Sequence, residues 1–121
     1  EFQTFNQNQQ LSFLINAYNA FTIKLIIDNY PVKSIKKIGG VFSSPWKKEF
    51  FQLRGKNTSL DAVEHEMLRK DYIEPRIHFG VNCASVGCPP LRAEAFVATK
   101  INDQLNEQAL LFLNKSILLR K

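Results

Sequence analysis

Residues 77–91 read IHFGVNCASVGCPPL and contain His78 together with both cysteines of the chain, Cys83 and Cys88. Apolar and polar residues alternate through residues 77–82, and this alternation predicts a β-strand. The small residues that follow, closed by two consecutive prolines, predict a tight loop in which the chain leaves the sheet. Proteins often place reactive groups on a loop that a rigid strand holds in position. We therefore expect a functional site in this stretch.

The rest of the sequence predicts more helix than strand. Apolar spacing, caps and breakers predict two long helices at residues 9–29 and 100–114, shorter helices at 31–37 and 60–70, and a strand entering a hairpin turn at 50–57. Thr58 or Ser59 is expected to cap the helix of residues 60–70, and Thr99 the last helix. Two long helices and shorter ones packed on a small sheet make a compact α+β fold.

A chain of 121 residues suits one domain, residues 1–121. We expect it to be cut from a longer protein at both ends, because it opens almost directly on a helix and stops within an apolar run. The net charge of +5 gives little indication of an anionic partner, and no nucleic-acid-binding motif is present. The most apolar run, residues 11–27, contains two asparagines and a lysine, which predicts a buried helix rather than a membrane span.

The first predicted helix carries a polar stripe. Ser12, Asn16 and Asn19 fall within about 60° of one another around the helix axis, and apolar residues border them on both sides. A stripe with such borders is expected to face the protein interior, where each amide needs a hydrogen-bond partner. The two amides either bind the backbone of a nearby loop, such as residues 39–46 or 77–91, or orient a catalytic imidazole or stabilise an oxyanion.

The predicted helix of residues 60–70 places Glu64 inside its apolar arc and His65 at the edge of that arc. A carboxylate directed at the core is expected to pair with a cation or to have a raised pKa. Arg76 and Arg92 are candidate cations. Glu64 is therefore either part of a structural ion pair or a catalytic acid or base.

Several chemistries remain open for the two cysteines. Cys83 suits a thiol nucleophile with His65 or His78 as its base. A Cys83–Cys88 disulfide would instead close and stabilise the loop. The two histidines and two cysteines also total four potential zinc ligands, although their spacing matches no known zinc module, and no metal site is predicted. Finally, both cysteines could be buried inert thiols.

These alternatives lead to two expectations of function. The first is a thiol-dependent hydrolase or acyl transferase acting on an amide or ester, for which a papain-like or transglutaminase-like arrangement is one frame. The second is a non-catalytic binding or structural module in which residues 77–91 form a clamp. The predicted catalytic residues are Cys83, His65, His78, Glu64, Asn16 and Asn19, and the predicted substrate-binding residues are Asn82, Ser85, Cys88, Arg92 and Trp46. We expect a small-molecule or peptide partner and no cofactor.

Four segments together resemble the uncharacterised domain-of-unknown-function family five-four-seven. They are HFGVNCASVGCPPL at 78–91, LINAYNAFTI at 14–23, YPVKSI at 30–35 and LDAVEHEMLR at 60–69. All four occur in the family's order, so the resemblance covers nearly the whole chain, although the family more often has Ala where this chain has Gly80. The resemblance implies bacterial members that are often exported, and thus a periplasmic or secreted location rather than a cytoplasmic one. It implies no reaction.

Overall fold

The computed structural model describes residues 1–31, 34–39, 44–82 and 91–119. Its central element is α1, Gln7–Asp28, which was predicted at residues 9–29. The helix begins in a capping box, in which the Asn6 side chain accepts from the Gln9 backbone N–H and the Gln9 side chain accepts from the Asn6 backbone N–H, both at 2.9 Å. Because these contacts satisfy N–H groups that lack partners inside the helix, the local sequence is sufficient to fix its start.

One short element precedes α1 in the chain, and the others follow it. Two short 3₁₀ helices are η1, Phe2–Thr4, and η2, Ile35–Lys37; the strands are β1, Phe51–Leu53, and β2, Lys56–Thr58. The other helical elements are α2, Leu60–Ala62; η3, Val63–Leu68; α3, Arg69–Asp71; α4, Ile77–Gly80; and α5, Ile101–Leu119. The fold is α+β, as predicted, and α5 extends five residues beyond its predicted end at 114.

The elements α2, η3 and α3 form one uninterrupted helix, called helix 60–71 below. Its N-cap is Ser59, whose hydroxyl accepts from the backbone N–H of Ala62 at 3.1 Å. Its middle portion, η3, is a π-helix rather than an α-helix. A π-helix has a wider turn than an α-helix, so residues five positions apart become neighbours on its surface. The predicted helix and one of its two predicted caps are thus confirmed, but the π-helical portion was not predicted.

The hairpin forms where the strand and turn were predicted. β1 and β2 pair antiparallel, with Phe51 opposite Thr58 and Leu53 opposite Lys56. The connecting residues Arg54 and Gly55 both have positive φ angles, 55° and 82°, as a two-residue turn of type I′ requires. The hairpin is attached to α1 by the Phe51 ring, which stacks on Phe21 at a centroid distance of 3.9 Å.

The strand predicted at residues 77–82 is wrong, because residues 77–80 form the one-turn helix α4. The backbone N–H of Val81 closes this turn by donating to the carbonyl of Ile77 at 3.2 Å. Ile77, Gly80 and Val81 are all buried, which is the helical spacing of three and four residues rather than alternation. A strand needs a neighbouring strand to satisfy its backbone groups, and the only strands in the described residues pair with each other.

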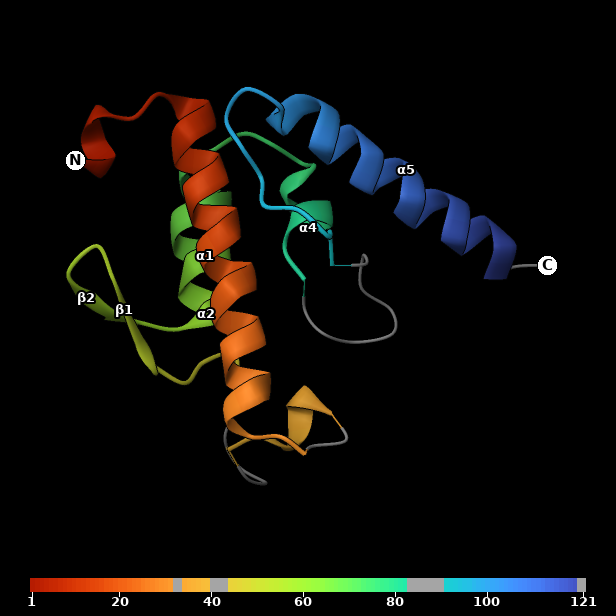
Figure 1. Cartoon of the computed structure of the whole chain (residues 1–121). Helices are drawn as coiled ribbons and strands as arrows, with labels where there is room; N and C mark the ends of the chain where they lie inside the picture. The colour runs from red at the N-terminus through yellow and green to blue at the C-terminus, as the bar shows by residue number, and fades with distance from the viewer. Residues whose placement is uncertain (32–33, 40–43, 83–90, 120–121) are drawn as a thin grey trace.

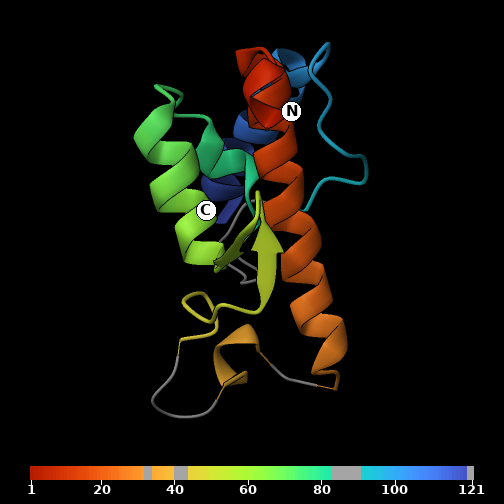
Figure 2. The ribbon, with the colours of Figure 1, turned by 90° about the vertical axis from the view of Figure 1, so that its left-hand side faces the viewer.

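The core lies where α1 meets helix 60–71, α4 and α5. Figure 1 and Figure 2 show α1 and helix 60–71 side by side, with the hairpin on one side of this pair and α4 and α5 on the other. Buried apolar residues from these elements include Leu11, Leu14, Ile15, Tyr18, Leu60, Val63, Leu68, Ile77, Ile101 and Leu105. Gly80 allows α4 to sit close to its neighbours, because a Cβ at this position would lie 3.1 Å from Leu105 and 3.4 Å from Ile15.

Candidate functional site

The buried amide of Asn19 holds the backbone at the end of α4. Its Nδ2 donates to the carbonyl of Gly80 at 2.9 Å, and its Oδ1 accepts from the backbone N–H of Asn82 at 2.8 Å. Asn19 is 8% exposed, so both hydrogen bonds lie largely out of water. Of the alternatives left open for this amide, the structure confirms binding to the backbone of residues 77–91. The contact fixes the chain at Asn82, the residue that directly precedes Cys83 in the sequence.

Asn16 makes the same kind of contact with a different segment. Its Nδ2 donates to the carbonyl of Phe96 at 2.7 Å, and its Oδ1 accepts from the Phe96 backbone N–H at 2.8 Å. Asn16 was expected to be mostly buried and is half-buried. It does bind backbone, but in the segment that leads into α5 rather than in either of the two loops considered. None of the hydrogen bonds described here for the two amides involves an imidazole.

Glu64 pairs with Arg69, which is five residues further along the π-helical stretch. Oε2 of Glu64 lies 3.1 Å from Nε of Arg69, and the Arg69 backbone N–H donates to the Glu64 carbonyl. The Glu64 side chain is only 19% exposed. The prediction that Glu64 contacts a cation is confirmed, but the two candidate cations were wrong. An α-helix would not place residues five apart as neighbours, so α-helical phasing could not identify Arg69.

The two arginines that were considered as partners of Glu64 are held elsewhere. Arg76 pairs with Glu74 at 2.6 Å and also donates to the side chains of two asparagines on α5. Arg92 pairs with Glu94 at 2.8 Å and with Glu107 at 2.6 Å. These carboxylates are close in sequence or belong to α5, so each arginine has nearer partners than Glu64.

Arg69 also orients His78. Its Nη2 lies 3.3 Å from Nδ1 of His78, and a guanidinium can only donate, so Nδ1 accepts and the ring proton is on Nε2. The ring of His78 lies edge-on to Phe79 and Phe112, at centroid distances of 5.5 and 6.2 Å. In this tautomer, His78 offers a hydrogen-bond donor rather than a base.

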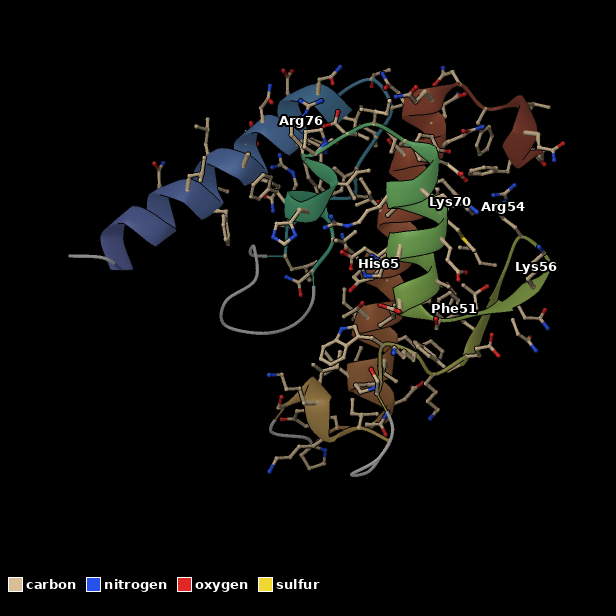
Figure 3. All side chains as sticks on the ribbon, turned by 180° about the vertical axis from the view of Figure 1, so that it is seen from behind. Phe51, Arg54, Lys56, His65, Lys70 and Arg76 are labelled. Carbon is tan, nitrogen blue, oxygen red and sulfur yellow. The ribbon has the colours of Figure 1, made fainter. Side chains whose placement is uncertain are left out.

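The other imidazole has the opposite arrangement. Nε2 of His65 lies 3.3 Å from Oδ1 of Asp61, one helical turn earlier. A carboxylate accepts the proton at Nε2, so the lone pair of the neutral ring is on Nδ1. Both side chains are accessible, with His65 55% and Asp61 40% exposed. Figure 3 shows His65 on the side of helix 60–71 away from the hairpin. The Asp61–His65 pair can therefore accept a proton from a group that approaches this side.

Tyr18 is a buried tyrosine of α1 whose pKa is affected by carboxylates of helix 60–71. The ring is buried, and burial raises the pKa of its hydroxyl well above its usual range, with smaller contributions from Glu64 and Asp61. The tyrosine thus stays neutral. Sequence reasoning missed Tyr18, Asp61 and Arg69; the four-residue spacing of Asp61 and His65 was the one signal that could have identified a pair.

The other predicted site residues fall into three groups. Trp46 is half-buried against the core, and its carbonyl accepts from the backbone N–H of Asp61 at 2.8 Å. Arg92 lines a cavity of about 270 Å³ together with Asn16 and Asn19. Cys83, Ser85 and Cys88 lie outside the described residues, and so does the disulfide that remained one of the alternatives for the two cysteines. Within the described part of the chain, no three His, Cys, Asp or Glu side chains are grouped closely enough to hold a metal ion.

The chain belongs to the family described as "Protein of unknown function, DUF547", whose model matches residues 2–113. This match confirms the resemblance on which the sequence interpretation drew. Comparison with curated proteins and with solved structures finds no match. Among the helices of the described residues, none is both long enough and apolar enough to cross a membrane.

Proposed function

We propose that the protein is a thiol-dependent hydrolase or acyl transferase that acts on an amide or ester, with Cys83 as nucleophile and His65 as general base. The observation that carries the proposal is the Asp61–His65 pair, in which Nε2 of the imidazole faces a carboxylate oxygen at 3.3 Å. Such a carboxylate fixes the ring orientation and stabilises the imidazolium that forms when Nδ1 takes a proton.

The contacts of Asn19 support the assignment of Cys83 rather than Cys88. The Asn19 amide holds the backbone N–H of Asn82 at 2.8 Å, one residue before Cys83. A nucleophile benefits when the chain that carries it is held rigidly, because correct positioning lowers the entropic cost of the reaction. Cys88 is six residues beyond Asn82 and precedes two prolines, which suits it to a turn.

The proposed reaction has two stages. The Cys83 thiol transfers its proton to Nδ1 of His65, and the thiolate attacks the substrate carbonyl to form a tetrahedral intermediate. The intermediate collapses to a thioester as the amine or alcohol leaves with the proton from His65. Water, or an amine or alcohol acceptor, then releases the acyl group and regenerates the thiol. The Nε2–H of His78 is the candidate donor to the oxyanion.

The test is alkylation of the native, reduced protein with iodoacetamide, followed by mass-spectrometric mapping of the labelled cysteine. We expect Cys83 to react faster than Cys88 near neutral pH, and His65→Gln to slow that reaction about tenfold, because the imidazole no longer generates thiolate. His78→Gln removes the candidate oxyanion donor but not the base, and it should leave the alkylation rate nearly unchanged, because alkylation by iodoacetamide forms no oxyanion. Equal labelling of both cysteines at a rate that neither variant alters would contradict the proposal.

The second candidate is a non-catalytic binding or structural module in which residues 77–91 form a clamp. The observation that favours it is that the Nδ2 and Oδ1 atoms of both Asn16 and Asn19 form hydrogen bonds with backbone atoms. The same labelling experiment separates the two candidates. Cysteines that react only after the protein is denatured would favour the clamp.

A further inference from the structure

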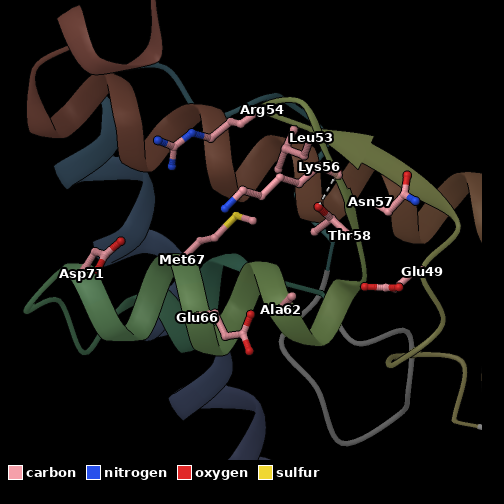
Figure 4. A pocket seen from close by; sticks show the side chains of 10 residues that line it. All are labelled: Glu49, Leu53, Arg54, Lys56, Asn57, Thr58, Ala62, Glu66, Met67 and Asp71. Carbon is pink, nitrogen blue, oxygen red and sulfur yellow. Dashed lines mark hydrogen bonds between the residues drawn. The ribbon is translucent and has the colours of Figure 1, made fainter.

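A cavity of about 370 Å³ lies between the hairpin and helix 60–71. Figure 4 shows its two walls: the hairpin supplies Arg54 and Lys56, and helix 60–71 supplies Met67, Glu66 and Asp71. All of the residues that line it belong to the described part of the chain. Pockets for small ligands typically start at about 300 Å³, so the cavity has room for a ligand the size of a short peptide.

Lys56 is directed into this cavity by the register of the hairpin. It lies opposite Leu53 and two residues before Thr58, so it shares their face of the sheet, and both of those residues are buried. Lys56 is nonetheless exposed, because the tip of the hairpin stands away from the helix. Figure 4 shows its side chain reaching from the hairpin toward Met67. A charged side chain on an inward face suggests a ligand rather than a packing role.

The cavity contains both signs of charge, yet these charges do not neutralise one another. Two cations, Arg54 and Lys56, and three carboxylates, Glu49, Glu66 and Asp71, line it. Among the ion pairs of the described residues, none involves any of these five side chains. A purely anionic ligand would be repelled by three carboxylates, and a purely cationic ligand by the two basic groups. A ligand with one charge of each sign fits both walls.

The hairpin also offers backbone groups to such a ligand. The two-residue turn makes Leu53 and Lys56 a hydrogen-bonded pair, so the next pair, Gln52 and Asn57, directs its N–H and C=O groups away from the partner strand. Asn57 is one of the residues that line the cavity. Strand edges of this kind bind extended peptides through main-chain hydrogen bonds.

From these observations we propose that the cavity binds a zwitterionic peptide of two or three residues. Its carboxylate lies against Lys56, its ammonium group lies against Glu66 and Asp71, and an apolar side chain packs on Met67. Figure 3 shows His65 on the opposite side of helix 60–71 from Arg54 and Lys56. The peptide site is thus separate from the Asp61–His65 pair, and it does not depend on the chemistry of Cys83.

The chain has a built-in reporter for this site, because Met67 is its only methionine. Protein labelled with ¹³C at the methionine methyl group gives one resonance for the chain's own methionine, from the wall of the cavity. We expect this resonance to shift saturably on titration with the dipeptide leucyl-leucine. N-acetyl-leucyl-leucine lacks the cation and leucyl-leucinamide lacks the anion; each should bind about tenfold more weakly, as expected for the loss of one charged hydrogen bond.

Variants assign the two charges of the peptide. Lys56→Gln should weaken leucyl-leucine binding about tenfold, and Glu66→Gln or Asp71→Asn should weaken it by a similar factor. The matched controls Lys36→Gln and Asp103→Asn make the same charge changes on exposed residues outside the cavity and should leave the affinity unchanged. A Met67 resonance that does not move at millimolar peptide, or equal affinity for the capped and uncapped peptides, would overturn the proposal.

Discussion

Two helices of this protein carry polar side chains that differ in their partners and in their burial. α1 contributes neutral amides, Asn16 and Asn19, whose partners are all backbone groups from distant parts of the chain. Helix 60–71 contributes ionisable groups, among them Asp61, His65 and Arg69, whose partners are other side chains. The amides are buried or half-buried, whereas these three ionisable side chains are each at least 40% exposed.

This difference in burial and in partners predicts that the two helices have different roles, one in stability and the other in function. A buried amide that satisfies two backbone groups is costly to remove, because the backbone groups lose their partners where water cannot replace them. An exposed ion pair contributes little to stability, but its groups can still reach a ligand. We therefore expect α1 to hold the molecule together and helix 60–71 to supply groups for function.

The largest expected effect is that of Asn19→Leu. It removes the hydrogen bonds to Gly80 and Asn82, and we expect it to lower the free energy of unfolding by about 2–4 kcal/mol. Urea denaturation monitored by circular dichroism measures this. Gln7→Leu, an exposed amide change in the first turn of α1, is the control and should cost far less. If Asn19→Leu lost no more free energy of unfolding than Gln7→Leu, the conclusion that the amides of α1 stabilise the fold would be wrong.

Asn16→Leu tests whether the burial of an amide determines how much free energy of unfolding is lost with its hydrogen bonds. The substitution also removes two hydrogen bonds, both to Phe96, but the site is only half-buried. Water can partly replace the lost amide, so we expect a smaller loss, about 1–2 kcal/mol. The same urea denaturation measures it. If Asn16→Leu proved more destabilising than Asn19→Leu, the ranking by burial would be wrong.

An intermediate case is the ion pair of Glu74 with Arg76, in which both side chains are mostly buried, 14% and 26% exposed. Hydrogen bonds from Arg76 lower the pKa of Glu74 below its ordinary value of 4.5, although burial opposes the shift. A carboxyl group with a lowered pKa stabilises the folded state at pH values above its ordinary pKa. This contribution is lost as the pH falls through the lowered pKa.

We therefore expect the unfolding free energy to fall on acidification below about pH 4.5, and Glu74→Gln to remove part of that fall. At neutral pH the variant should be about 1 kcal/mol less stable, since it loses charged hydrogen bonds at a partly exposed site. Thermal unfolding across a pH series measures both effects. A variant whose pH profile parallels that of the parent protein would show that this pair resembles the exposed ones.

The smallest expected effect on stability is that of His65→Gln. Because His65 and Asp61 are 55% and 40% exposed, the loss should be under about 0.5 kcal/mol. Thermal unfolding at neutral pH is the measurement, and it can be made on the same variant used for alkylation. A variant that is as stable as the parent protein but has slowed Cys83 alkylation would support a functional rather than a structural role for the groups of helix 60–71. A variant that is clearly destabilised would assign the pair a structural role instead.

The sequence was sufficient where local interactions decide the structure. The Ser59 cap and the Arg54-Gly55 turn act within a few residues, so patterns in the sequence locate helix 60–71 and the hairpin. The apolar spacing also predicted α1, but two residues late at residue 9, because the Asn6 cap was not recognised. The polar stripe of α1 likewise required only helical geometry to predict that Asn19 is buried and hydrogen-bonded. Family membership followed from the same local motifs.

Tertiary structure decided what those patterns could not. Residues 77–82 alternate like a strand, but no strand among the described residues lies beside them to complete the hydrogen bonds. Residues 77–80 instead fold as a helical turn against α1 and α5. The Glu64–Arg69 pair depends on a π-helix that α-helical spacing does not predict. The contact of Asn16 with Phe96 joins residues 80 positions apart. Such contacts depend on how the elements pack together, because only packing brings groups from distant segments within hydrogen-bonding distance.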